Sequence, residues 1–170
     1  MTLTYGLKDN TINYGVRSFD KITEKEKVVY LNCSDNDLTE LNVSQYPLLT
    51  ELCCSYNGLT VLDLSQVSLK SRFLYENCPV LKELYCSYND LTVLDLSHCP
   101  LLEVLNCRNN KLTVLDLSYC PLLTQLNCSC NRLTVLDLSH CPVLKELYCS
   151  YNKLTVLDLS YCPLLKELYC

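Results

Sequence analysis

The chain has 170 residues, 49% of them hydrophobic, with a formal net charge of -5 and a pI near 5.0. This length and composition are typical of one folded domain. The acidic balance and the lack of a Lys/Arg cluster argue against binding to nucleic acid or an anionic membrane. The N-terminus lacks the features of a secretory signal, and no stretch of eighteen apolar residues occurs. We therefore expect a soluble, cytoplasmic protein.

Residues 1–27 do not share the pattern of the rest of the chain, and we interpret them as an N-terminal cap or leader. Within them, the segment "SFDKITEKEKV" is predicted to form a short helix. Stacked repeats need such a cap because the first repeat otherwise exposes its apolar interior.

Residues 28–170 repeat. The phrase "LTVLDLS" starts at positions 59, 91, 112, 133 and 154, and the variant "LTELNVS" starts at 38, so the steps are 21, 32, 21, 21 and 21 residues. The unit is L-x-x-L-x-C-x-x-N-x-L-T-x-L-D-L-S-x-C-P-x. Units begin at Val28, Leu49, Leu81, Leu102, Leu123, Leu144 and Leu165. Six are complete, the second carries an insert at 66–76, and the seventh is truncated. A fixed period of this length predicts stacked repeats.

The motif L-x-x-L-x-C-x-x-N-x-L resembles the leucine-rich repeat, and the two similar halves of each unit resemble the short subclass called IRREKO repeats. This resemblance implies a mostly β leucine-rich repeat solenoid. It would be a right-handed coil with a parallel sheet on its concave side and little helix apart from the N-terminal cap. The subclass also implies a microbial source. Similar repeats in some bacterial effectors precede a separate catalytic domain, so delivery into a host cytosol is an alternative location.

Alternation of side chains along each unit predicts which residues form the core. In "ELYCS", Leu147 and Cys149 point inward while Glu146, Tyr148 and Ser150 point outward, as in a strand. The same reasoning buries the two leucines of "LDL". An asparagine recurs where each coil must turn, and we expect it to satisfy backbone groups there, since asparagine can do so and also tolerates left-handed angles.

Twelve of the fourteen cysteines fall into two columns, one after each strand and one before each proline. A buried free thiol packs as a small hydrophobic group, which explains one cysteine per coil. Disulfides between neighbouring coils and metal binding remain alternatives, although no C-x-x-C pair occurs. Cys53 and Cys130 lie outside the columns, and Cys130 is the expected labelling site. No nucleophile, base and orienting group converge, so the sequence predicts neither an enzyme nor a cofactor or metal site.

Tyrosine and asparagine dominate the predicted outward side of the sheet. This composition suits protein recognition, because it offers large amphipathic area and adaptable polar contacts. The alternative is that the tyrosines only stabilise neighbouring strands by stacking. The candidate partner-binding residues are Tyr56, Tyr85, Tyr88, Asn106, Asn109, Asn127, Tyr148, Tyr151 and Tyr169.

The opposite side carries a row of aspartates with threonines beside it. Five carboxylates at the spacing of the coils repel one another, so we expect local hydrogen bonds to compensate, with bound calcium as an alternative. Ice binding by the threonine row is a further, weaker alternative. The aspartates are Asp63, Asp95, Asp116, Asp137 and Asp158.

Two irregular segments remain open at this stage. The insert at 66–76 is either a degenerate half-coil or a protruding loop. Cys170 falls on an inward position, so the chain either continues in a longer protein or forms a homodimer through an open C-terminal end. Our main prediction is a non-catalytic protein-protein interaction module that binds a protein through its concave Tyr/Asn face. Alternatives are a self-associating scaffold and the recognition part of a longer effector.

Overall fold

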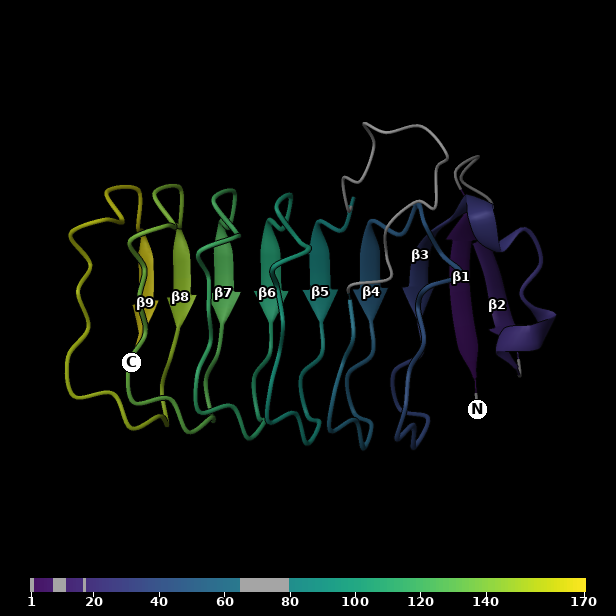
Figure 1. Ribbon diagram of the computed structural model, residues 1–170, viewed down its shortest axis with the longest axis horizontal. Helices are drawn as coiled ribbons and strands as arrows, with labels where there is room; N and C mark the ends of the chain where they lie inside the picture. The colour runs from purple at the N-terminus through teal and green to yellow at the C-terminus, as the bar shows by residue number, and fades with distance from the viewer. Residues whose placement is uncertain (1, 8–11, 17, 65–79) are drawn as a thin grey trace.

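The computed structural model describes residues 2–7, 12–16, 18–64 and 80–170. Within these ranges nine strands form one sheet in the order β2-β1-β3-β4-β5-β6-β7-β8-β9 (Figure 1). The strands are β1 (Leu3–Leu7), β2 (Ile12–Val16), β3 (Val28–Asn32), β4 (Glu51–Cys53), β5 (Glu83–Tyr85), β6 (Val104–Asn106), β7 (Gln125–Asn127), β8 (Glu146–Tyr148) and β9 (Glu167–Tyr169). Short 3-10 helices, η1 (Phe19–Lys21) and η2 (Lys25–Lys27), precede β3.

From β3 onward, equivalent residues of successive units are paired. All of these strands are parallel, and the central leucine of each lies opposite the central leucine of the next, as in Leu105 and Leu126. Because the pairing is in register, every position of the unit forms a column along the solenoid (Figure 1). The structure confirms the predicted leucine-rich repeat solenoid with very little helix.

The core lies inside the coil, between the sheet and the returning segments. Leu105 and Cys107 from the strand side face Leu112, Leu115 and Leu117 from the "LTVLDL" side, and all five are buried. Burial of this kind is the main force that holds a thin coil together, since each repeat buries its apolar face only against its neighbours. The predicted alternation of inward and outward side chains is confirmed on both sides.

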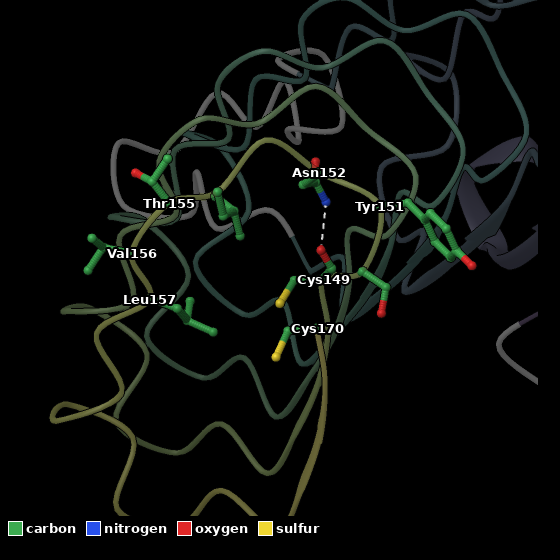
Figure 2. A pocket seen from close by; sticks show the side chains of 9 residues that line it. Cys149, Tyr151, Asn152, Thr155, Val156, Leu157 and Cys170 are labelled. Atoms are coloured by element: carbon green, nitrogen blue, oxygen red, sulfur yellow. Dashed lines mark hydrogen bonds between the residues drawn. The ribbon is translucent and has the colours of Figure 1, made fainter.

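The asparagine column closes each turn with hydrogen bonds. Asn152 Nδ2 donates to the carbonyl oxygen of Cys149 in its own coil at 2.9 Å (Figure 2), and it also donates to the carbonyl oxygen of Cys128 in the preceding coil at 3.0 Å. Its Oδ1 accepts from Leu133 N at 3.0 Å. The prediction that this column satisfies backbone groups is confirmed. One asparagine per coil thus supplies the polar partners that a buried turn requires.

The N-terminal segment differs from the predicted helix. Residues 18–28 form two single-turn 3-10 helices, interrupted by Glu24 in a left-handed conformation (φ 51°). The edge of the first coil is covered instead by β1, which pairs antiparallel with β3 and places Tyr5 opposite Leu31. Because β1 supplies hydrogen bonds to an otherwise open edge, a strand covers β3 more completely than a short helix would.

The insert at 66–76 lies outside the described residues, as do Cys78 and Pro79. Its interpretation as a half-coil or a loop therefore stays a prediction.

Candidate functional site

The outward side of the sheet, here called the sheet face, carries the candidate binding residues in two ladders. The third residue of each strand forms the strand ladder, and the strand pairings place its members in consecutive order. The members are Cys53, Tyr85, Asn106, Asn127, Tyr148 and Tyr169. Five of the nine predicted residues therefore share one row.

The other four predicted residues lie in a second row, the turn ladder, three positions after the strand ladder. Its members are Tyr56, Tyr88, Asn109, Cys130 and Tyr151, and all have left-handed backbone angles with φ between 53° and 57°. The sequence indicated only that the column asparagine tolerates this conformation, and the structure places it on the residue before the asparagine. The column asparagine must point its amide inward to reach backbone groups in two coils. The left-handed conformation is therefore adopted by the residue before it.

Aromatic stacking connects neighbouring coils on this face. The Tyr56 and Tyr88 rings stack with centroids 4.4 Å apart, and the Tyr148 and Tyr169 rings stack at 4.8 Å. The Arg108 guanidinium lies 5.9 Å from the centroid of the Tyr88 ring. Stacked and cation–π pairs contribute favourably to stability. Part of the tyrosine content therefore has a structural role, as the alternative interpretation expects.

The middle of the sheet face is hollow. In the strand ladder, Asn106 and Asn127 lie between Tyr85 and Tyr148, and these shorter side chains leave a shallow depression of about 160 Å³ between the two rings. We call this depression the notch. Its remaining lining comes from Val104, Leu105, Gln125, Leu126 and Glu146. Because Asn109 and Cys130 replace tyrosine in the turn ladder at the same two coils, both ladders are lowest at the notch.

Glutamates fix the orientation of the tyrosines at the edges of the notch. Tyr85 OH donates to Glu83 Oε2 at 2.7 Å, and Tyr148 OH donates to Glu167 Oε2 at 3.0 Å. The pKa of Tyr85 is raised by burial and by this hydrogen bond, and the pKa of Tyr148 is raised mainly by its bond to Glu167. Both hydroxyls therefore stay protonated at neutral pH, and their hydrogen bonds to the glutamates restrict the two rings at the edges of the notch.

The cysteines of the described chain are free thiols, and most of them are buried. Burial raises the pKa of Cys86 and Cys99 to about 12. Such thiols do not form thiolates at neutral pH, so they serve as packing groups rather than nucleophiles. Among the residues that the structure describes, no cluster of three or more His, Cys, Asp or Glu side chains has the arrangement of a metal site.

The aspartate row is compensated locally, as the first interpretation predicts. Ser97 N donates to Asp95 Oδ1 at 2.9 Å, and the same bond recurs between Ser118 and Asp116. Hydrogen bonds from the side chain and the backbone N–H of these serines lower the pKa of both aspartates, so the carboxylates are ionised at neutral pH. Each carboxylate thus accepts hydrogen bonds from the turn that follows it and stabilises that turn.

Sequence reasoning predicted the exposed threonine row but did not join it with the neighbouring valines into one surface. The Thr and Val of each "LTVL" segment both point away from the core, and they form an exposed row on the side of the coil opposite the turn ladder. Figure 2 shows Thr155 and Val156 outside the coil, Leu157 inside it, and Tyr151 on the other side. We call this row the Thr–Val stripe: Thr60–Val61, Thr92–Val93, Thr113–Val114, Thr134–Val135 and Thr155–Val156. The signal was present, because two consecutive outward residues interrupt the alternation in every unit.

A depression of about 310 Å³ at the last coil is lined by Cys149, Asn152, Leu154, Leu157 and Cys170, among others (Figure 2). These residues belong to the same inward columns that fill the core between earlier coils. We therefore regard this space as the interior of a coil and assign no ligand to it.

Comparison with known families supports this architecture. Two family profiles, both described as Leucine Rich Repeat, match residues 108–125 and residues 90–107 and 153–169. Together with the observed coil, these matches identify the chain as a leucine-rich repeat protein. The leucine-rich repeat fold is a common protein-protein interaction module. A comparison with the curated proteins finds no match.

Several solved structures are similar to this chain. A functional domain of InlJ from Listeria monocytogenes, which includes a cysteine ladder, is 35% identical with a TM-score of 0.63; the match covers 85% of this chain and 35% of that one. A leucine-rich repeat protein from Leptospira interrogans shares the fold at 24% identity and a TM-score of 0.64, covering 75% and 32%. The LRIM1/APL1C complex contains a chain that is 28% identical with a TM-score of 0.64, covering 75% and 24%.

The chain thus spans about a third or less of the length of these structures. Among the described residues, no helix has the length and apolar character needed to cross a membrane.

Proposed function

We propose that this chain is a non-catalytic module that binds a protein partner through its sheet face, with the notch as the central contact. The observation that carries the proposal is the pair of tyrosines, Tyr85 and Tyr148, standing on either side of a depression floored by Asn106 and Asn127. Aromatic rings around a recess are typical of the residues that dominate binding energy in protein interfaces. Amides in the floor can both donate and accept, so they suit a side chain or backbone segment that enters the notch.

The backbone of the turn ladder supports the same proposal. A left-handed conformation costs roughly 1–2 kcal/mol for a residue with a side chain, and glycine or asparagine would avoid most of that cost. Three of the five positions nevertheless carry tyrosine. Stability alone therefore does not account for these side chains.

Stacking explains some of the tyrosines but leaves others to be accounted for. Tyr56 and Tyr88 stack on each other, whereas Tyr151 is 84% exposed and follows Cys130 in the turn ladder. An aromatic ring that is mostly in water contributes little to folding, and it is available to a partner. The structure of the LRIM1/APL1C complex contains a chain that is 28% identical to this one, and this similarity to a member of a complex agrees with a partner-binding role.

The sheet face would keep this role within a longer protein. Since the match covers only about a third of these related structures, the same face would serve as the recognition part if this sequence belongs to a longer protein. The residues that would carry recognition are the same in that case: both ladders and the notch between them.

The test uses two variants of the notch and a matched control. The first variant combines Tyr85→Ala with Tyr148→Ala, and the second fills the notch with Asn106→Tyr and Asn127→Tyr. Tyrosine already occupies this column in other coils, so the filled variant should fold. The control combines Tyr119→Ala with Tyr161→Ala, which removes two tyrosines of 51% and 53% exposure from a different side of the coil.

Proteins retained by the immobilised wild-type chain from a cell extract are identified, and the affinity of each purified candidate is measured by calorimetry. We expect at least one partner whose affinity falls more than about tenfold in both notch variants and is unchanged in the control, as for loss of interface hot spots. A partner that binds all three variants equally, with circular dichroism confirming that they are folded, would exclude the notch as the binding site.

A further inference from the structure

The Thr–Val stripe is the most regular exposed apolar surface on the described chain. Its five valines are between 61% and 77% exposed, and each sits beside an exposed threonine whose methyl group extends the apolar row. In-register stacking repeats the pair once per coil, so the stripe is continuous rather than scattered. Contiguous apolar surface of this kind on a water-soluble face marks an interaction site.

Rows of opposite charge border the stripe in the last three full units. Along each coil the order is a basic residue, an inward leucine, the Thr–Val pair, a second inward leucine and an aspartate. The basic row consists of Lys111, Arg132 and Lys153, and the acidic row consists of Asp116, Asp137 and Asp158. The stripe therefore lies between a positive border and a negative border.

The acidic border is ionised and has space beside it. Each of its aspartates accepts a hydrogen bond from the serine two residues later, which lowers its pKa and keeps it charged at neutral pH. A depression of about 420 Å³ lies between the stripe and this border, lined by Val135, Val156, Asp137, Asp158 and Tyr161, among others. It offers room for a long basic side chain whose carbon atoms contact valine while its charge meets a carboxylate.

The order of the two borders restricts how a second copy of the chain can pack on the stripe. If two copies face each other with their solenoid axes parallel, the two-fold axis exchanges the borders, so the basic row of each copy meets the acidic row of the other. If the axes are antiparallel, each row meets its own kind and repels it. Only the parallel arrangement is complementary in charge.

We propose that the Thr–Val stripe is a homodimer interface in which two solenoids pack side by side with parallel axes. Lys111, Arg132 and Lys153 of each copy then lie opposite Asp116, Asp137 and Asp158 of the other. Burial of the valines supplies the main stabilisation, because isolated surface ion pairs contribute little. The charges set the orientation of the two copies and separate this packing from the antiparallel one.

The charge complementarity of the proposed interface ends at Lys111. In the unit before Lys111 the basic position is taken by Asp90, which pairs with Lys111 Nζ at 2.7 Å. Asp90 would meet Asp95 of a second copy, so charge complementarity ends there. The proposed interface consequently covers the coils from residue 111 onward.

The first experiment measures solution mass by light scattering across a concentration series. We expect the wild-type chain to dimerise as its concentration rises. Val135→Glu, in the middle of the stripe, should abolish the dimer without unfolding the chain, because Val135 is exposed. The control Tyr151→Glu, on the sheet face, should leave the dimer intact, and so should a polar segment added at the C-terminus. A monomeric wild type, or a dimer lost in either control, would overturn the proposal.

A second experiment tests the charge pairing between the two copies through charge exchange. One variant replaces the acidic row by lysine, and the other replaces the basic row by glutamate. In a dimer of either variant alone, like charges would lie opposite each other, so each variant should be a monomer. An equimolar mixture of the two variants should form a heterodimer. Homodimers of either variant, or a mixture that stays monomeric, would contradict the proposed pairing. Circular dichroism of both variants confirms that the coil is intact. The proposed partner binding at the notch does not depend on either result.

Discussion

The side-chain amide of Asn110 donates a hydrogen bond to the carbonyl oxygen of Cys86, one coil earlier, at 3.0 Å. The same nitrogen donates to Cys107 O at 3.0 Å, and Asn110 Oδ1 accepts from Leu91 N at 3.0 Å. One buried side chain therefore satisfies backbone groups in two coils. This relationship recurs along the asparagine column, and it makes cohesion between the coils depend on single residues.

We predict that Asn110→Ala destabilises the chain by about 2–4 kcal/mol, because it leaves buried backbone donors and acceptors without partners. Urea denaturation followed by circular dichroism measures the change in the free energy of unfolding. The adjacent Asn109 is exposed and left-handed with φ 54°, so Asn109→Gly provides the control and should cause no comparable loss. Equal effects at both positions would show that the column asparagine has no special structural role.

The turn ladder leads to a second prediction. Tyr151 has φ 57°, a region that alanine disfavours and glycine adopts freely. We expect Tyr151→Gly to be more stable than Tyr151→Ala by about 1 kcal/mol, since both changes remove the same side chain but only alanine keeps the left-handed strain. Thermal or urea unfolding of the two variants gives this difference directly.

Tyr148 is the matched comparison, because it lies in β8 with an ordinary strand conformation. There the order should reverse, with glycine less stable than alanine by about 0.5–1 kcal/mol. The same order at both positions would contradict the assignment of strain to the turn ladder.

The period of the sequence was sufficient to predict the sheet, the inward columns and the role of the asparagines, because each follows from alternation along a repeated unit. Leu105 and Cys107 are buried as that alternation requires. The repeat could not locate the left-handed residue, since that depends on which of two neighbours points its side chain inward. It also gave no information on residues 1–27, where pairing of β1 with β3 depends on a contact distant in sequence.

The candidate site was predicted as a set of residues but not as a shape. Tyr85 and Tyr148 were both expected to face outward, and the structure places them in one row with Asn106 and Asn127 between them. The notch depends on the order of large and small side chains along the sheet, which becomes visible only when the strand pairing is known. The threonine row was predicted, but the valines were not recognised as part of the same surface because each valine, taken alone, is an ordinary exposed residue.

Thiol reactivity provides a third prediction. Cys53 is partly buried, and its pKa is raised to about 12 by burial and by the nearby Glu51 carboxylate. Cys130 lies in the turn ladder and is also only partly buried. We expect a maleimide at neutral pH to label Cys130 much faster than Cys53, because the reagent attacks the thiolate.

The measurement uses a background in which Cys78 and Cys170 are replaced by serine, and mass spectrometry locates the label. Adding Cys130→Ser should remove the fast reaction, and denaturant should then expose the column cysteines. Rapid labelling of Cys86 or Cys107 in the folded chain would contradict the assignment of these columns to the dry interior.

The aspartate row gives a prediction on pH. Hydrogen bonds from Ser97, Ser118, Ser139 and Ser160 lower the folded-state pKa of Asp95, Asp116, Asp137 and Asp158. A carboxyl whose pKa is lower in the folded state than in the unfolded state stabilises the fold above the unfolded pKa, which is about 3.9 for aspartate. That contribution is lost as the pH falls below about 4 through the folded-state pKa.

Replacing all four aspartates by asparagine should flatten this pH dependence while keeping the turns. The first unit already shows that asparagine can do so, because Ser44 N donates to Asn42 Oδ1 at 2.9 Å. Urea midpoints measured from neutral pH to about pH 2, below the unfolded aspartate pKa, should decrease less in the variant than in the wild type. Glu51 has the opposite shift, since burial and Glu83 raise its pKa, but it is present in both proteins and cancels in the comparison. Identical acid sensitivity in the two proteins would mean that the serine bonds do not favour the ionised aspartates, and the row would then need another source of compensation.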